Sequence, residues 1–190
     1  MSTAVKKQVT LAEYLAGEEV ATFRSEYYRG EVFAMTGGSV RHARIQAVLL
    51  RKLGNQLEGK PCQPYAADLR ISVKPIGLYT YADLSVICGP PQIDPSDKHG
   101  VTNPTVIIEV LSPTTEKYDR TQKFACYRQL ESLQEYMLIS SEAPGVEVFS
   151  RSEQDGNWEI QYSQQLSDVL HLKSVACQLF MQEIYADLPE

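Results

Sequence analysis

The segment that most constrains the fold is a short apolar run at residues 106–111, with the sequence VIIEVL. Branched aliphatic side chains of this kind are typical of a strand inside a β-sheet. Glu109 interrupts the run with an ionisable carboxylate. Burial of a carboxylate is costly, and it neutralises the group unless a cation or hydrogen-bond donors hold the charge. The run therefore predicts a core strand, and it requires a partner for Glu109.

The length and composition of the chain predict one globular domain. At 190 residues, the chain is long enough to bury a single core without disulfide or metal links. We expect the domain to span residues 1–190, with the fold core at about 25–185 and a loose N-terminal tail at 1–10. The composition, 43% hydrophobic and 22% charged, is that of an ordinary globular protein.

Three further features bear on location and partners. The N-terminus lacks the apolar run of a signal peptide and no segment approaches the length of a bilayer span, so we expect a soluble cytoplasmic protein with no membrane partner. The net charge of -6 excludes a general nucleic-acid binder, which usually carries a basic excess, so any contact with nucleic acid must be local. The cysteines lack the paired short spacing of zinc or redox sites. We expect reduced thiols, mostly in the core, at Cys62, Cys88, Cys126 and Cys177.

A helix and a hairpin are predicted near the N-terminus. Thr10 and Glu13 form a capping-box pattern that opens a short helix to about residue 16, and Gly17 is expected to end it. The segments SEYY and EVFAM then predict a β-hairpin. Its turn at Arg29 and Gly30 uses the positive backbone dihedral that glycine adopts readily.

Ser39 is predicted to cap a longer helix that ends at about Glu58. The inward face of this helix is apolar and continues toward the N-terminus through His42 and Gln46. The opposite face is basic, and it is most simply a solvated surface, although it can also follow a phosphate backbone. The apolar face comprises Leu49, Leu50, Leu53 and Leu57, and the basic face comprises Arg41, Arg44, Arg51 and Lys52.

The remaining elements predict an α/β (α+β) fold. Alternating residues at 69–73 and in YADLSVIC at 81–88 indicate two strands, and the long loop at 89–103 is expected to be mobile. A helix at about 118–129 follows the 106–111 strand. Three strands come next, EYMLIS, VEVFSR and WEIQY, and the chain closes with a strand near residue 169 and a helix at about 178–185. This order predicts a mixed central sheet flanked by helices.

Two carboxylates fall within the predicted strands. Asp83 lies in YADLSVIC and Glu109 in VIIEVL, so neighbouring strands can bring them close enough to share a divalent cation, which hard oxygen ligands favour. Without a cation the pair would repel, and one pKa would rise. Asp119, Lys123 and Tyr127 share one stripe of the following helix, which can direct Lys123 toward the carboxylates. An ammonium group in that position suits the stabilisation of phosphate charge.

These residues resemble the signature of the Uma-two family, endonucleases of the PD-(D/E)XK superfamily. The resemblance rests on Asp83 in YADLSVI and Glu109 in VIIEVLSPTT, followed by Asp119, Lys123 and Tyr127. It extends to RGEVFAMTGGSVRH near the N-terminus and to LQEYMLIS, and it covers roughly residues 11–185.

The resemblance implies a restriction endonuclease-like core and Mg²⁺-dependent cleavage of DNA, with Mn²⁺ as a substitute ion. Asp83 and Glu109 would be the metal ligands, joined by the backbone carbonyl of Val110, and Lys123 would stabilise the phosphate or orient the attacking water. There are two departures: Ala82 stands where the superfamily motif has proline, and Leu111 stands where it has a lysine two residues after the acid. The family moves that lysine to the helix, at Lys123.

A further catalytic position has three candidates. Superfamily members often direct a glutamate into the site from the first core helix, and this helix has none near its start. We rank Glu31 on the preceding hairpin first, then His42, then Gln46. A lone histidine is more often a hydrogen-bonded core residue than a base, so His42 also has that structural interpretation.

Other interpretations stay open at this point. Glu109 can be an edge-strand carboxylate, and Lys123 can be a solvated lysine of its helix. The acidic net charge and the missing in-strand lysine also fit a non-catalytic nucleic-acid- or protein-binding module that retains the nuclease fold. A carboxylate-pair glycosidase fits less well, because it leaves Lys123 without a role. A homodimer would explain cleavage of both DNA strands, but no segment identifies its interface.

Overall fold

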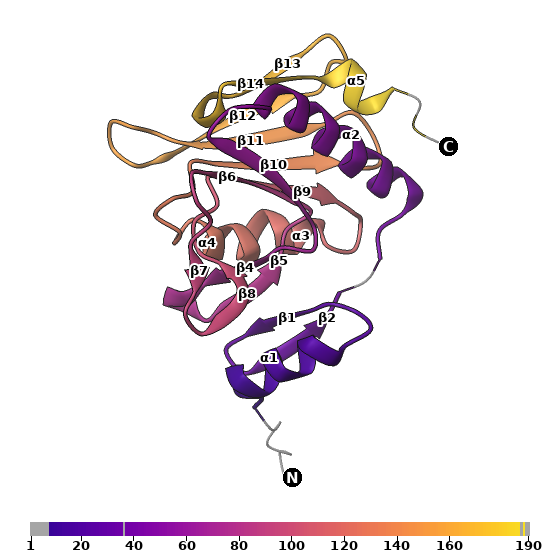
Figure 1. Ribbon diagram of the computed structural model, residues 1–190. Coiled ribbons are helices and arrows are strands. Elements are labelled where there is room, and N and C mark those ends of the chain that lie inside the picture. Colours follow the sequence, from indigo (N-terminus) through magenta and orange to yellow (C-terminus); the bar gives the residue numbers. More distant parts are fainter. Residues whose placement is uncertain (1–7, 36, 187, 189–190) are drawn as a thin grey trace.

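The computed structural model describes residues 8–35, 37–186 and 188, which form two six-stranded sheets, a small two-stranded sheet and the helices that pack on them (Figure 1). The core sheet has the order β12-β11-β10-β9-β6-β3, and the outer sheet has the order β2-β1-β5-β4-β8-β7. Both are mixed, because β9 pairs parallel to β10 and β4 pairs parallel to β8 while their other pairings are antiparallel. The predicted mixed central sheet corresponds to the core sheet.

The strands are short, from two to six residues. In the core sheet they are β3 (Cys62–Ala66), β6 (Leu84–Cys88), β9 (Val106–Leu111), β10 (Glu135–Ser140), β11 (Val146–Arg151) and β12 (Trp158–Ser163). In the outer sheet they are β1 (Ser25–Tyr28), β2 (Glu31–Ala34), β4 (Arg70–Val73), β5 (Leu78–Tyr81), β7 (Ile93–Asp94) and β8 (Asp97–Val101). The small sheet pairs β13 (Val169–Leu172) with β14 (Cys177–Phe180).

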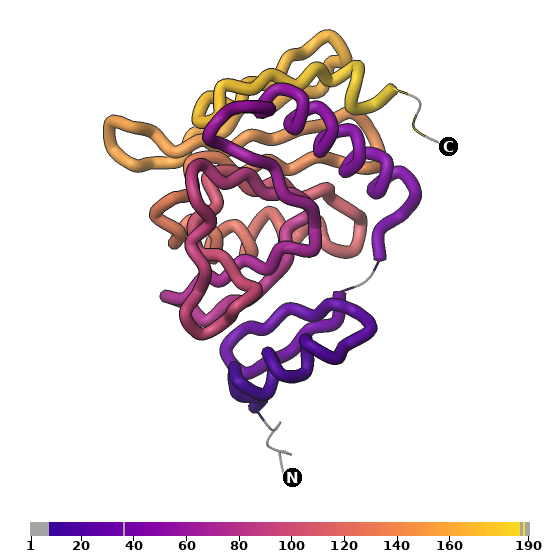
Figure 2. The backbone as a smooth tube through the Cα atoms, in the orientation of Figure 1, coloured from indigo at the N-terminus to yellow at the C-terminus, as the bar shows by residue number. Residues whose placement is uncertain are grey.

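The helices lie at the N-terminus, on the core sheet and between the two large sheets. They are α1 (Leu11–Val20), α2 (Val40–Leu57), α3 (Glu116–Tyr118), the π-helical turn η2 (Asp119–Lys123), α4 (Phe124–Tyr127) and α5 (Met181–Tyr185), with single 3₁₀ turns η1 (Lys74–Ile76) and η3 (Lys173–Val175). Figure 2 shows the chain passing from the N-terminal hairpin along one side of the molecule to α2 on the far side of the core sheet.

Two hydrophobic layers cover the two faces of the core sheet, and β9 contributes to both. Its residues Val106, Ile108 and Val110 pack with α2 and the β13–β14 hairpin. Ile107 and Leu111 face the other way, toward α4 and the outer sheet. Burial on both faces explains why this strand is apolar almost throughout.

Several local predictions are confirmed at residue level. The capping box of α1 forms in both directions between Thr10 and Glu13. The hairpin turns at Arg29 and Gly30, with φ angles of 48° and 93°. Ser39 caps α2 by accepting a hydrogen bond from the amide of His42. These caps and turns form between residues that are close in sequence, so they depend little on the tertiary fold.

The predicted end of the first helix is wrong. The helix continues through Gly17 to Val20 because a tertiary contact holds its last turn: Glu18 is buried and accepts hydrogen bonds from the amide and hydroxyl of Ser25. A glycine inside a helix costs only about 1 kcal/mol, which such contacts offset.

Three other segments also differ from the prediction. The long loop at 89–103 contains the strands β7 and β8 and joins the outer sheet. The predicted closing helix at 178–185 begins as strand β14 and becomes helical only at Met181. Strand β3 was not predicted. It contains Pro64 in its middle, which is tolerated because β3 is an edge strand.

The prediction of reduced cysteines holds for two residues and is wrong for two. Cys126 and Cys177 are free and buried. Cys62 and Cys88 form a disulfide bond. They stand directly opposite each other in the antiparallel β3–β6 pair, and that register brings their side chains into bonding range.

The predicted N-terminal tail is described only in part. Most of the predicted loose tail, residues 1–7, lies outside the described residues. The amide of Val9 donates a hydrogen bond of 2.9 Å to the carbonyl of Gly30 in the hairpin turn. In the described part of the chain, no helix combines the length and the apolar character required to cross a membrane.

Candidate functional site

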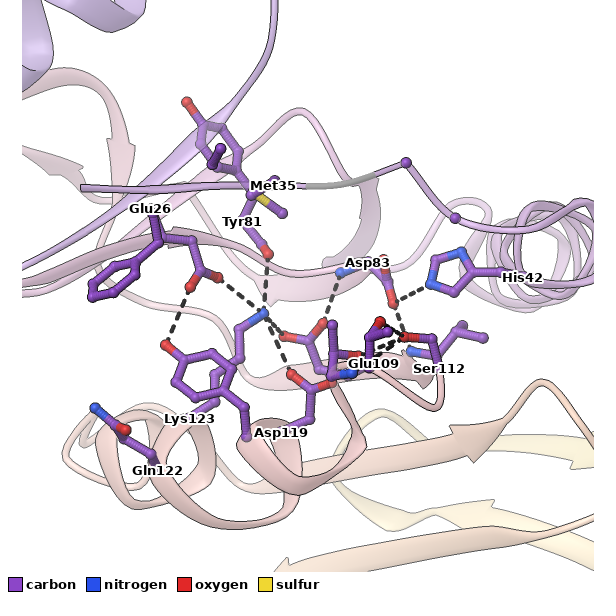
Figure 3. A pocket seen from close by; sticks show the side chains of 18 of the residues that line it. Glu26, Met35, His42, Tyr81, Asp83, Glu109, Ser112, Asp119, Gln122 and Lys123 are labelled. Atoms are coloured by element: carbon purple, nitrogen blue, oxygen red, sulfur yellow. Dashed lines mark hydrogen bonds and ion pairs between the residues drawn. The ribbon is translucent and has the colours of Figure 1, made fainter.

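A cavity of about 470 Å³ opens between the β1–β2 hairpin, the N-terminus of α2, the end of β9 and the α3–η2 helical segment (Figure 3). Residues far apart in sequence meet here, because β1 pairs with β5, and the chain passes from β5 directly into β6 of the core sheet. Asp83, Glu109 and Lys123 all line this cavity, and so do Val110 and His42. The structure therefore brings together the predicted residues except Glu31.

Asp83 lies in a bend between β5 and β6, so its predicted position in the middle of one strand is wrong. The bend is the point at which the chain leaves the outer sheet and enters the core sheet. The Asp83 carboxylate accepts hydrogen bonds from the Val110 amide (2.6 Å, Oδ2) and from Gln46 Nε2 (2.6 Å, Oδ1). His42 Nε2 lies 3.1 Å from Oδ2. These contacts hold both oxygens at the cavity.

His42 and Gln46 thus contact Asp83 from the inward face of α2. Burial alone lowers the pKa of His42, but the hydrogen bond and the charge of Asp83 outweigh burial, so the pKa is raised above its usual range. A histidine held in this way favours the charged form and fixes the orientation of the carboxylate.

Glu109 is 3% exposed and lies on the face of β9 that meets the helical segment. Its Oε1 lies 2.9 Å from Lys123 Nζ and accepts a 3.0 Å hydrogen bond from the Tyr127 hydroxyl. Its Oε2 accepts from the amide of Asp83 at 3.4 Å. These contacts are the partners that the position of Glu109 in an apolar strand requires.

The pKa of Glu109 is raised to about 8. Burial is the main cause, Lys123 opposes it, and the charges of Asp83 and Asp119 add to the rise. The expected repulsion between the two carboxylates is therefore present.

Lys123 is 4% exposed and lies at the end of the π-helical turn η2. Its ammonium group is 3.2 Å from Glu26 and 3.8 Å from Asp119, in addition to the contact with Glu109 (Figure 3). It also donates to the carbonyl of Tyr81 at 3.4 Å. Burial lowers the pKa of Lys123, but the three carboxylates more than compensate and hold it well above its usual value. The solvated-lysine interpretation is excluded by this burial.

Glu26 is the site residue that sequence reasoning missed. It lies on β1, is buried, and accepts hydrogen bonds from the Tyr118 hydroxyl (3.1 Å) and the Thr80 hydroxyl. Glu31, the predicted hairpin candidate, is exposed on β2 and does not line the cavity. Alternation in SEYY places Glu26 and Tyr28 on one face, which was a usable signal. It could not show that this face meets Lys123.

The chemistry of the side chains fits a hard divalent cation. Four carboxylates, from Glu26, Asp83, Glu109 and Asp119, line the cavity with Lys123 and His42 as the basic groups. In the described residues no group of three or more His, Cys, Asp or Glu side chains is arranged to hold a metal. The oxygen ligands of such an ion would therefore include groups besides Asp83 and Glu109, and backbone carbonyls are suitable ones.

The site also accounts for the departure from the superfamily motif. Leu111 shares the face of Glu109 on β9 and is buried in the hydrophobic layer against α4. Lys123 lies on the helical segment that packs against this face of β9, and it contacts Glu109 from there. The ammonium group and the strand carboxylate thus meet in space although Lys123 lies 14 residues later in the sequence.

Comparisons with known proteins identify the family of this chain. Residues 11–182 match the model of the Uma2 (Uma-two) family, described as "Putative restriction endonuclease". The chain is 38% identical over 179 residues to the "Uncharacterized protein slr1290" of Synechocystis sp., covering 93% of this chain and 90% of that protein. It is 36% identical over 151 residues to the "Uncharacterized protein sll1609" of the same organism, covering 80% and 85%.

A solved structure shows the fold. It is a "putative nuclease belonging to DUF820" from Anabaena variabilis, with a TM-score of 0.73 at 17% identity, and the match covers 93% of this chain and 99% of that chain. The predicted restriction endonuclease-like fold is confirmed by this likeness. With the family model matching most of the sequence and the spaced acidic residues meeting at one cavity, this chain belongs to the Uma2 family of restriction endonuclease-like proteins.

Proposed function

We propose that this protein is a Mg²⁺-dependent endonuclease that hydrolyses phosphodiester bonds in DNA, with Mn²⁺ as a substitute ion. The observation that carries the proposal is the meeting of Asp83, Glu109 and Lys123 at one cavity, with Lys123 Nζ 2.9 Å from Glu109 Oε1. Membership of a family of restriction endonuclease-like proteins supports it.

Asp83 and Glu109 would hold the ion, with the backbone carbonyl of Val110 as a further ligand. When bound, Mg²⁺ supplies a Lewis acid for the phosphate and makes the attacking water more acidic. Asp83 keeps its orientation through Gln46 and His42, which are positioning residues in this scheme.

Lys123 would act through its charge. Its raised pKa keeps it protonated at neutral pH, so it does not serve as a general base. A protonated amine next to Glu109 can instead stabilise the charge that builds on the phosphate and can orient water by hydrogen bonding. Glu26 and Asp119 hold the ammonium group in place from two other sides.

The test is cleavage of plasmid and linear DNA in Mg²⁺ by the wild type and by single variants. We expect Asp83→Asn, Glu109→Gln and Lys123→Met each to lower the rate by about a hundred-fold or more. Glu26→Gln should also lower it, whereas its hairpin neighbour Glu31→Gln should not. Circular dichroism would show that each variant is folded.

Calorimetric titration with Mg²⁺ distinguishes the main alternative. Binding of the ion by the wild type, and its loss in Asp83→Asn and Glu109→Gln, would agree with the proposal. Equal cleavage by the wild type and all variants would refute the assignment of the site. Binding of DNA without any metal-dependent cleavage would favour the non-catalytic binding module.

A further inference from the structure

We infer that the cavity accepts a nucleotide of single-stranded or locally unpaired DNA rather than intact duplex, and that Phe33 provides the surface on which its base stacks. This inference rests on the proposed function and names the form of the substrate. Depth, aromatic lining and charge each contribute to it.

The reactive groups lie at the bottom of the cavity rather than on a protruding surface. Glu109 and Lys123 are buried, and Asp119 beside them is also buried. A volume of about 470 Å³ is in the range of sites that enclose small molecules, so it can surround one nucleotide. Enzymes that take a nucleotide into an enclosed pocket must move it out of the base stack, which costs least in single strands.

An unpaired aromatic ring lies at the edge of the cavity. Phe33 on β2 is 45% exposed, although it lines the cavity, and none of the ring contacts found among the described residues involves it. Phe33 stands directly opposite Glu26 in the β1–β2 register, so its ring is adjacent to the Lys123 ion pairs. Met35 lies two residues further along and also lines the cavity (Figure 3).

An exposed aromatic ring beside a phosphate-binding site is the usual platform for an unstacked base. Every base has a π face, so stacking on Phe33 would stabilise any of the four without reading sequence. Tyr28, on the same face of the hairpin, extends the aromatic lining. A base in a duplex is already stacked on both sides, and it could not use this surface.

The charges around the cavity favour a ligand held mainly by stacking over one held by many phosphate contacts. Duplex recognition uses several lysines or arginines along the phosphate backbones. Among the described residues that line this cavity, only Lys123 and His42 are basic, and Lys123 is already surrounded by three carboxylates. The basic face of α2 does not supply them, because none of its arginines and lysines lines the cavity, and Arg41 donates instead to the carbonyls of Ser141 and Glu142.

The test compares binding of a fluorescein-labelled oligonucleotide with no self-complementarity and of its duplex, by fluorescence anisotropy. Ca²⁺ replaces Mg²⁺ so that the carboxylates have a divalent partner while cleavage is checked on gels. We expect the single strand to bind at least about ten-fold more tightly than the duplex. Phe33→Ala should weaken single-strand binding about ten-fold, the range for loss of one stacked base, whereas Phe33→Trp should preserve it.

Phe180→Ala is the matched control, because Phe180 is 41% exposed and lies on β14 at the far side of the molecule (Figure 1). It should bind both forms like the wild type. Equal or tighter binding of the duplex, or wild-type binding by Phe33→Ala, would overturn the inference. If Mg²⁺-dependent cleavage of duplex then persisted and was lost in Asp83→Asn, the proposed function would stand without it. Absence of cleavage of either form would instead refute the proposed function.

Discussion

The replacement Lys123→Met tests the electrostatic design of the site most directly. Methionine has a similar length and no charge, so the packing is largely kept while the only ammonium group between Glu26, Glu109 and Asp119 in the described structure is lost. Removing one partner of a buried ion pair leaves uncompensated charge and typically costs about 3–5 kcal/mol of stability. Because these groups are almost fully buried, we expect a loss in that range at pH 8.

The loss should depend on pH in a defined direction. In the wild type, the pKa of Glu109 is about 8, and Lys123 acts to lower it. Without Lys123 this pKa rises further, so near and above pH 8 the folded variant binds more protons than the folded wild type. Between pH 4.5, the ordinary value for glutamate, and about pH 7, Glu109 is protonated in both folded proteins, so both stabilities fall in parallel. Above about pH 8 the Glu109 contribution levels off in the wild type but continues to fall in the variant, so the difference between them should grow there.

Urea denaturation followed by circular dichroism at several pH values measures this difference. Lys117→Met is the control, since Lys117 is exposed on the same helical segment and should change stability by less than about 0.5 kcal/mol. Stabilities of the Lys123→Met variant and the wild type that agree within about 1 kcal/mol at pH 8 would refute the reasoning. A difference that does not grow between about pH 7 and about pH 9.5 would refute it as well.

Three other predictions concern metal binding, the disulfide and close packing. His42→Ala should lower Mg²⁺ affinity by about 10- to 100-fold in calorimetry while the fold is kept, because the orientation of Asp83 is lost. Cys62→Ser should lower stability by about 3 kcal/mol, and a reductant should lower the melting temperature of the wild type but not of the variant. Gly100→Ala should cost about 1–3 kcal/mol in urea titrations, since its Cβ would clash with Asp97 Oδ2 and Ser72 Oγ. Gly54→Ala, with open space around it inside α2, should instead stabilise by up to about 1 kcal/mol.

Local sequence signals predicted many elements of this fold. The capping residues Thr10 and Ser39 and the turn residues Arg29 and Gly30 act through neighbours in the chain, and they occur where expected. The apolar run at Val106–Leu111 likewise forms a strand buried on both faces. In each case the interactions or the apolar pattern of a few adjacent residues are enough to predict the local structure.

The predictions were wrong where the structure depends on which distant strands pair with each other. The alternation in YADLSVIC was interpreted as one strand, but the chain bends at Asp83 because its two halves belong to different sheets. Alternation records which residues face inward and does not record which sheet a strand joins. The disulfide between Cys62 and Cys88 was missed for the same reason, since only the β3–β6 register brings them together.

The amino-acid sequence by itself determined the chemistry available to this protein: two acids, Asp83 and Glu109, near strands that favour burial, and Lys123 at a helical spacing that could reach them. The tertiary structure alone decided that Glu26, and not Glu31, completes the cluster around Lys123. The physical reason is that both residues lie on the same face of the hairpin, but β1 pairs with β5 inside the outer sheet whereas β2 is the edge strand. Packing of β1 against a helical segment about a hundred residues away in sequence buries Glu26 and leaves Glu31 exposed, and that packing follows from the summed burial of the whole fold.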